Sequence, residues 1–317
     1  MPTSSTLPFF IGDILATERK FFRASTGINT VCDPARIDYD WKEGVSDLAA
    51  AVNVTISSSG RINRRKGKTL KVPLSSHSLF CDGGECVFVY DSGLYLLETN
   101  FSYRLLTSLS SNNHMAYTQI GGRIYYTNNQ DKGYVENGIR YVWEKTTNYV
   151  GPVTQKVITG PFPGNHLAFR DGRIYITTGN VVWYSEYQAL DWFDMHRNNI
   201  QFNTHVRMVK PVTGGVYISS SKAMYFFSGP TAPEFGGKKL TSYPALEWSD
   251  AIDYLDGIDV PDLEASGLCA LWSTPEGAML GTPDGNLINL NKKKVIYPHG
   301  TKGASLLRGL NFIHTIE

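Results

Sequence analysis

The chain has 317 residues, of which 42% are hydrophobic and 19% charged, and its formal net charge is +1. A charge so close to zero excludes a protein whose whole surface attracts nucleic acid or an anionic membrane, so such a partner must meet a local patch. No apolar run approaches the roughly 20 residues of a membrane span, and the beginning lacks the basic leader of a secretory signal, so we expect no membrane partner.

Residues 1–44 do not share the pattern of the rest of the chain. They contain two apolar patches separated by polar residues. We predict an N-terminal arm that packs on the remainder of the protein or on a neighbouring subunit. The candidate subunit contacts in this arm are Phe9, Phe10, Ile11, Phe21 and Phe22.

A candidate hairpin follows the arm. Residues 51–56 alternate as a strand does, Ser59 and Gly60 signal a turn, and residues 69–72 form a second candidate strand. Five cations are packed into residues 61–68, namely Arg61, Arg64, Arg65, Lys66 and Lys68. Two interpretations stay open: solvated charges that keep a sheet edge from pairing, or a patch that faces DNA phosphates without reading sequence.

Six segments with a common order of elements make up most of the remaining chain. Each has an apolar first strand, a turn with Gly, a β-rich second strand and, in most cases, further strands. The two most similar read GRIYYT from Gly122 and GRIYIT from Gly172. The second strands are expected near residues 87–90, 124–126, 174–176, 216–218, 278–280 and 310–313.

This spacing, about 45 residues with about four strands each, is typical of a β-propeller. A four-stranded sheet has two apolar faces, and stacking such sheets around an axis buries both. We therefore predict an all-β fold, with a β-propeller of about six blades over residues 45–317. The sixth segment has only two strands, so we expect the hairpin of residues 51–72 to complete this C-terminal blade and close the ring.

A long segment at about 229–263, rich in Pro, Gly and aromatic residues, is expected to be an inserted loop. Loops of that length are usually functional or interfacial. Its candidate subunit contacts are Phe235, Tyr243 and Trp248. The aromatic residues Trp183, Trp192, Phe193, Tyr243 and Trp248 are also candidates for stacking on sugar rings, although a core or interface role is the preferred interpretation.

Three histidines, His77, His114 and His166, occupy one position in the repeat, just before the first strand. A ring of imidazoles at the propeller mouth can hold a metal or perform acid–base chemistry. We favour a structural role, because these residues follow the repeat and sites usually interrupt it. Four aspartates, at positions 82, 91, 171 and 284, lie in tight turns, where Asp bonds its own backbone.

The sequence lacks the motifs of nucleophilic hydrolases, metalloproteases, nucleotide-binding loops and sialidase-like propellers. We therefore expect no enzymatic activity, no cofactor and no metal. The four cysteines show no metal spacing. Cys81 and Cys86 flank a turn and can face each other across a hairpin, but free thiols are the expectation for a protein made in a reducing cytoplasm.

One stretch resembles a known family. The match lies in Gly27-Ile28-Asn29, then Cys32-Asp33-Pro34-Ala35-Arg36, then Asn53-Val54-Thr55-Ile56, and then the run from Gly60 to Gly67, GRINRRKG. These residues resemble the opening of the tail hub or nozzle proteins of short-tailed bacteriophages, also called DNA-stabilisation or head-closure proteins. The resemblance covers about fifty residues and implies a propeller that assembles in rings of about six copies below the portal and adaptor, around the path of the genome.

The sequence thus predicts a virion structural protein, a ring subunit of a phage head-to-tail connector or tail hub, made in the host cytoplasm. Expected partners are other copies of the chain, portal, adaptor and tail proteins, and double-stranded DNA in transit, bound without sequence specificity. The alternative from another class is a carbohydrate-binding or glycan-cleaving propeller used in receptor recognition. A bacterial propeller that only scaffolds other proteins is a third option.

Overall fold

The computed structural model describes residues 10–11, 14–15, 24–40, 44–57, 59–82, 84–146, 157–229, 232–260, 263–291, 294–308 and 311–317. The chain divides into two compact units. Unit 1 comprises Met1–Thr69 with Asn289–Tyr297, and unit 2 comprises Leu70–Ile288 with Pro298–Glu317. In the part that the structure describes, no helix is long and apolar enough to cross a membrane.

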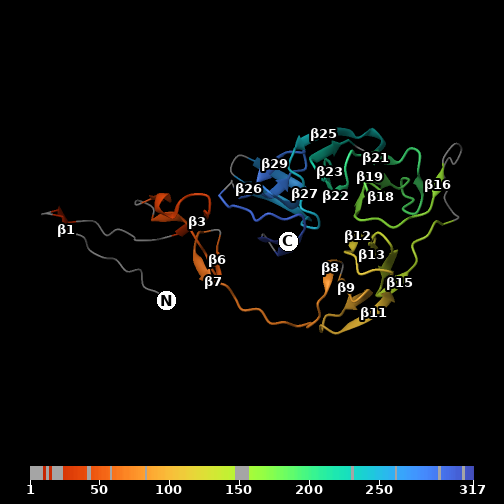
Figure 1. Cartoon of the computed structure of the whole chain (residues 1–317), viewed down its shortest axis with the longest axis horizontal. Helices are drawn as coiled ribbons and strands as arrows, with labels where there is room; N and C mark the ends of the chain where they lie inside the picture. Colours follow the sequence, from red (N-terminus) through yellow and green to blue (C-terminus); the bar gives the residue numbers. More distant parts are fainter. Residues whose placement is uncertain are drawn as a thin grey trace. The chain divides into compact units, whose positions relative to one another are not determined.

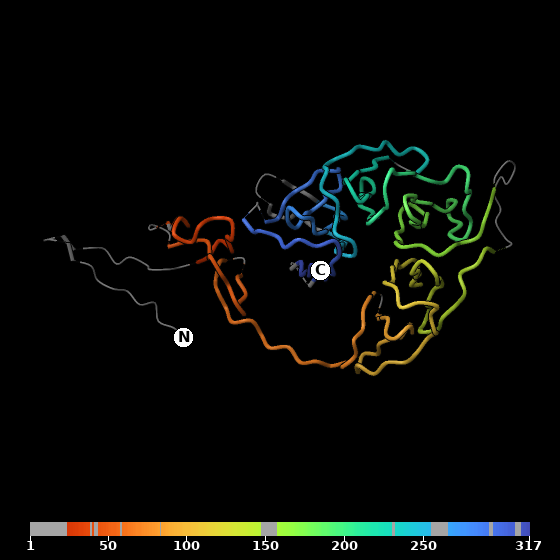
Figure 2. The backbone as a smooth tube through the Cα atoms, viewed as in Figure 1, coloured from red at the N-terminus to blue at the C-terminus, as the bar shows by residue number. Residues whose placement is uncertain are grey.

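Unit 2 is built mainly from four-stranded antiparallel sheets that follow one another in chain order (Figures 1 and 2). The first contains β8 (His77–Asp82), β9 (Glu85–Tyr90), β10 (Gly93–Leu97) and β11 (Tyr103–Ser108). The second contains β12 (Ala116–Ile120), β13 (Arg123–Thr127), β14 (Lys132–Glu136) and β15 (Ile139–Tyr141). The third contains β17 (Leu167–Arg170), β18 (Arg173–Thr178), β19 (Val181–Tyr184) and β21 (Asn199–Gln201).

Two further sheets of the same kind complete this series. The fourth contains β22 (Val206–Val212), β23 (Gly215–Ser220), β24 (Met224–Ser228) and β25 (Gly236–Thr241). The fifth contains β26 (Ala251–Val260), β27 (Leu263–Thr274), β28 (Gly277–Gly281) and β29 (Leu287–Asn289). A short pair is formed by β16 (Ile158–Thr159), which precedes the third sheet in sequence, and β20 (Phe193–Asp194), which lies between β19 and β21.

The first strands of successive sheets contact one another, from β8 and β12 through β17, β22 and β26 to β30 (Gly303–Arg308). This is the arrangement of inner strands around the axis of a propeller. The all-β propeller architecture predicted from the repeat is confirmed.

The repeated GRIYY and GRIYI sequences show how the alternation of a strand builds this stack. Ile124 and Tyr126 of β13 enter a core cluster with the first sheet, whereas Tyr125 between them packs toward the third sheet. In β18, Ile174 and Ile176 face the second sheet, and Tyr175 faces the fourth. Because successive side chains of a strand point to opposite faces, the second and third sheets each contribute to two cores.

The last sheet has two strands in the described chain, β30 and β31 (Asn311–Ile316). One of its faces packs on the fifth sheet through Leu307 and Phe312, which lie against the cluster of Cys269, Leu271 and Leu280. Leu306, on the other face, is 58% exposed. The last repeat is therefore half the size of the others, as the sequence predicted.

The N-terminal hairpin consists of β6 (Val54–Ile56) and β7 (Ile62–Arg64), which form a separate two-stranded sheet. The prediction that residues 69–72 supply its second strand is wrong, because Gly60, with a φ of +75°, turns the chain early enough for Ile62 to pair with Ile56. In the described chain, β6 and β7 form no hydrogen-bonded pair with β30 or β31. Ring closure by this hairpin stays a prediction.

Unit 1 also contains a small mixed sheet. In it, β3 (Ala24–Ile28) runs parallel to β5 (Val45–Leu48), which pairs antiparallel with β4 (Tyr39–Asp40). A short 3-10 helix, η1 (Pro34–Arg36), begins where Asp33 accepts a hydrogen bond from the Ala35 amide. Strands β1 (Phe10–Ile11) and β2 (Ile14–Leu15) form a further pair. The boundary between the two compact units lies after Thr69. The division into an arm of residues 1–44 and a propeller from residue 45 stays a prediction.

Two other predictions are corrected in unit 2. The segment at about 229–263 is not one inserted loop, because it contains η2 (Ala232–Glu234), β25 and the whole of the long strand β26. Cys81 and Cys86 are joined by a disulfide across the β8–β9 hairpin, where they are directly paired residues, so the expectation of free thiols fails for this pair. Cys32 and Cys269 are free.

Candidate functional site

A cluster of histidines forms where the inner strands of unit 2 begin. His77 is the first residue of β8, His114 precedes β12 by two residues, and His166 and His205 stand directly before β17 and β22. Because the sheets are traversed in the same sense, residues before the first strands gather at one end of the propeller axis. The sequence predicted this grouping for the first three histidines. His205 was missed, although its place before Val206 is the same signal.

The aromatic rings of the cluster contact one another in the order His77, His114, Trp248 and His166. The centroids of His77 and His114 lie 5.9 Å apart and their planes differ by 20°. Trp248 is held between two imidazoles, with its ring centroid 4.1 Å from that of His114 and 4.4 Å from that of His166. Burial, and then the neighbouring His77, lower the pKa of His114 from its ordinary value of 6.5 to about 4. His114 is therefore uncharged at neutral pH.

Glu247 lies between two further histidines. Its Oε1 atom is 3.7 Å from Nε2 of His166 and 3.9 Å from Nε2 of His205, so both are longer than direct hydrogen bonds. Burial by itself raises the pKa of Glu247, but His166, His205 and Lys302 outweigh it and hold the pKa below its ordinary value. The carboxylate is thus the negative centre of the cluster.

Residues 243–250, here called the cluster loop, connect the cluster to several sheets. The Ala245 amide donates to Ser219 Oγ of the fourth sheet, and the Leu246 amide donates to the Ser273 carbonyl of the fifth. The Glu247 amide donates to the Thr301 carbonyl, just before β30. At the other end of the loop, Lys210 Nζ of β22 lies 2.6 Å from Asp250 Oδ2.

Within this loop, Trp248 has a φ of +67°. A bulky side chain in this left-handed region is uncommon, and such strain persists only where surrounding contacts impose it. The side chain of Trp248 is half-buried, and its ring contacts two imidazoles of the same chain. Its predicted contact with another subunit or a sugar stays a prediction. Among the described residues, no group of three or more His, Cys, Asp or Glu side chains has the arrangement of a metal site.

The other aromatic candidates are mostly inside the protein. Trp192 and Phe193 are buried, and Trp183 packs against the core with its Nε1 donating to Thr178 Oγ1. Phe235 lies against Phe227 and under the guanidinium of Arg170. Tyr243, at 46% exposure, is the one of these side chains open to solvent. A role of these residues in binding a sugar or another subunit stays a prediction.

The predicted DNA-facing residues lie together in unit 1. Arg61, Arg64, Arg65, Lys66 and Lys68 are all exposed. Arg61 lies directly before β7, Arg64 is its last residue, and the other three follow it. No ion pair joins any of them to a carboxylate of the described chain. They form a basic stretch at one end of a hairpin, available to an outside anion.

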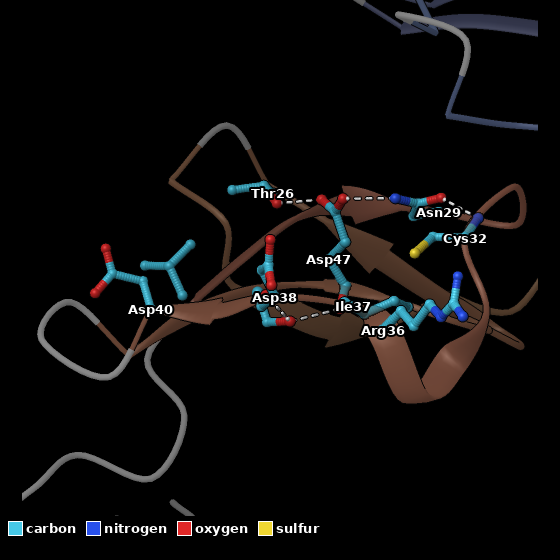
Figure 3. A pocket seen from close by; sticks show the side chains of 10 residues that line it. Thr26, Asn29, Cys32, Arg36, Ile37, Asp38, Asp40 and Asp47 are labelled. Carbon is cyan, nitrogen blue, oxygen red and sulfur yellow. Dashed lines mark hydrogen bonds between the residues drawn. The ribbon is translucent and has the colours of Figure 1, made fainter.

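The motif at residues 27–36 builds a pocket of about 500 Å³ in unit 1 (Figure 3). Asn29 Oδ1 accepts from the amide of Cys32, and its Nδ2 donates to Asp47 Oδ2. Asp47 also accepts from Thr26 Oγ1 and, at 3.0 Å, from Lys294 Nζ. Burial acts to raise the pKa of Asp47, but these three partners lower it overall. The motif therefore joins the small sheet to the distant segment around Lys294.

The predicted contacts of the N-terminal arm cannot be placed in a site. Phe9, Phe21 and Phe22 lie outside the described residues. Phe10 and Ile11 form β1, paired with β2, and their side chains are not described.

No protein-family model and no curated protein matches the chain. Among solved structures, it is similar to a gluconolactonase from Xanthomonas campestris, with 12% identity, a TM-score of 0.44 and coverage of 73% of this chain and 79% of that one. It is also similar to a catalytically inactive virginiamycin B lyase from Staphylococcus aureus with quinupristin, with 10% identity, a TM-score of 0.45 and coverage of 89% of this chain and 90% of that one. With the WD40 β-propeller domain of Doa1, the identity is 11%, the TM-score is 0.41, and the match covers 73% of this chain and 72% of that one. These likenesses concern the fold alone.

The same comparison corrects the prediction that the chain is not an enzyme. That prediction rested on missing sequence motifs, yet the structures similar in fold include gluconolactonases and streptogramin B lyases. Identities of 9–14% transfer no substrate and no reaction to this chain.

Proposed function

We propose that the protein is a structural subunit of a ring in the head-to-tail connector or tail hub of a short-tailed bacteriophage. The observation that carries the proposal is the organisation of the motif that resembles this family. Its residues belong to a compact unit distinct from the propeller, and that unit displays five exposed basic side chains. A propeller body with a separate, charged N-terminal unit suits a protein that assembles with others around DNA.

The charge distribution suits a passage for DNA. Each chain has a formal net charge of +1, so the whole surface does not bind DNA strongly. Five cations per subunit, repeated around a ring, give a sequence-independent and salt-sensitive contact with phosphates. Such a contact holds DNA in position and still allows it to leave.

Ring closure within the subunit belongs to this proposal. The last sheet has two strands where the other five have four, and the β6–β7 hairpin supplies two strands. We propose that this hairpin completes the last blade. In a Cys32→Ser background, cysteines placed at Thr55 and Thr315, both exposed, are expected to form a disulfide. A disulfide within one chain supports closure as proposed. Disulfides that join several chains place the hairpin on a neighbouring copy. The absence of any disulfide under oxidation contradicts completion of the blade.

The assembly is tested by electron microscopy of the purified chain, with and without portal and adaptor proteins. Rings, and retention of the chain on portal–adaptor complexes, are the expected result. A monomer that stays single at high concentration and binds neither partner would contradict the assignment.

The role of the basic residues is tested in assembled particles. Replacing Arg61, Arg64 and Arg65 together with Ser is expected to reduce genome retention. The matched control replaces Lys238 and Lys239, exposed on β25 of the propeller, with Ser. Equal retention in the two variants would remove DNA from the proposed partners of the hairpin.

A further inference from the structure

We propose that Trp248 is a proton-sensitive latch: contacts with two imidazoles hold its ring inside the cluster, and protonation of His114 releases it. The inference concerns unit 2 alone and does not depend on the virion assignment.

The geometry confines the movement to a short segment. On one side of Trp248, the Leu246 amide is bonded to the Ser273 carbonyl and Leu246 is 1% exposed. On the other side, Ser249 is fully buried and its Oγ donates to the Leu246 carbonyl at 2.7 Å. The two anchors leave Trp248, with its left-handed backbone, as the residue that can swing out. Leaving the stack also permits an ordinary backbone conformation, so the strain favours release.

The charges around the stack set its response to acid. The groups that face it are His77 from the first sheet, His114 from the second, His166 from the third, and His205 and Lys210 from the fourth; Glu247 and Asp250 come from the cluster loop and Lys302 from the start of β30. Asp250 is paired with Lys210, and Glu247 faces His166 and His205. His114 is stacked between another imidazole and the indole, so a proton there meets no direct carboxylate partner in the described cluster.

The size of the response follows from linkage. His114 has a pKa of about 4 when packed, against an ordinary value of 6.5. Acid therefore favours the state in which His114 is hydrated. If release of Trp248 restores the ordinary pKa in full, the ratio of open to closed molecules rises about 30-fold between pH 8 and pH 5. A proton on one flanking imidazole is also attracted to the indole face, and this attraction opposes release and reduces the rise.

The test is fluorine NMR of the full chain labelled with 5-fluorotryptophan, in which Trp248→Phe identifies the resonance of Trp248. On acidification from pH 8 to pH 5, this resonance is expected to move toward the solvent-exposed position before the resonances of the other five tryptophans change. His114→Phe keeps a ring in the stack without a titrating group, and is expected to abolish the movement. His299→Gln, an exposed histidine outside the cluster, is the matched control and is expected to leave it unchanged.

A second variant covers the case in which His114→Phe does not fold. His77→Gln removes the neighbour that contributes to the low pKa of His114, and is expected to weaken the acid response several-fold. Two results overturn the proposal. One is a Trp248 resonance that moves only together with the other tryptophans, which means global unfolding. The other is an early movement that persists unchanged in the folded histidine variants.

Discussion

The two compact units of this chain are each stabilised internally by a different kind of contact. In unit 2, the second to fifth sheets bury apolar side chains on both faces. Side chains such as Ile176, Val216 and Trp272 are almost completely removed from water. In the described part of unit 1, none of the hydrophobic side chains reaches that degree of burial. Its fixed points are polar, chiefly Asp47 with Asn29 and Lys294. The comparison teaches that a repeat supplies its own core, whereas a short irregular segment depends on specific hydrogen bonds.

The largest expected difference between the units comes from truncating a core side chain. Ile176→Ala in the core between the second and third sheets removes buried methyl groups and leaves a cavity, which costs about 2–5 kcal/mol of unfolding free energy. Ile56→Ala in the half-buried hairpin of unit 1 is expected to cost less than about 1 kcal/mol. Urea denaturation measures both, and equal losses would contradict the contrast.

Acidification is expected to destabilise unit 2 next most strongly. The folded-state pKa of His114 is about 4, below the 6.5 of the unfolded chain, so the unfolded state binds the proton first as the pH falls. Stability is therefore complete above about pH 6.5 and declines between pH 6.5 and pH 4, by about 3 kcal/mol in total. Glu247, whose pKa is lowered, adds a loss of the same sign at still lower pH.

Thermal unfolding at several pH values checks this prediction. His114→Phe is expected to flatten the dependence between pH 6.5 and pH 4, with His299→Gln as the control. A slope that is the same in wild type and His114→Phe would show that another group controls the acid response.

A smaller effect is expected from the polar network of unit 1. Lys294→Met removes the ion pair with Asp47 and is expected to destabilise the small sheet by about 0.5–1.5 kcal/mol. Hydrogen exchange at the amides of β3 and β5 should accelerate, while that of β18 and β23 stays unchanged. Lys238→Met, on the exposed face of β25, serves as the control. Faster exchange in both units would mean that the network supports the whole chain.

The smallest effect on stability is expected from the basic hairpin. Replacing Arg61, Arg64 and Arg65 with Ser should change the unfolding free energy by less than about 0.5 kcal/mol, since the side chains are exposed. If they contact phosphates, the slope of log affinity for duplex DNA against log salt should fall by about 3. An unchanged slope would leave the hairpin charges with no role in DNA binding.

Much of the propeller was predictable because its signals are local. The turns with Gly and the alternation of apolar residues placed the second strands of the sheets, and β13 and β18 lie where the repeated GRIYY and GRIYI sequences indicated. The strand expected at residues 69–72 was not formed, since the turn at Gly60 places the pairing partner of β6 at residues 62–64. The inserted loop was misjudged because β26 carries several acidic residues, which weaken the alternation of a strand.

The candidate site was predictable only in part. Three of its histidines share a repeat position, so their grouping followed from the periodicity. Glu247 and Trp248 belong to no repeat, and their contacts join them to residues about forty to more than one hundred positions away in sequence. The side chain of Trp248 also looked like a surface aromatic, since its burial depends on rings contributed by two other sheets.

By itself, the sequence determined that the chain forms strands, where most of them begin and end, and that its last repeat is shorter than the others. It did so because turn residues and the two-residue period act between near neighbours. Only the tertiary structure decided that His205, Glu247 and Trp248 join the other three histidines at one end of the inner strands, and that Lys294 joins the N-terminal motif. Those contacts depend on how successive sheets stack and on which segments, distant in sequence, come back into contact. Neither can be deduced from a short stretch of sequence.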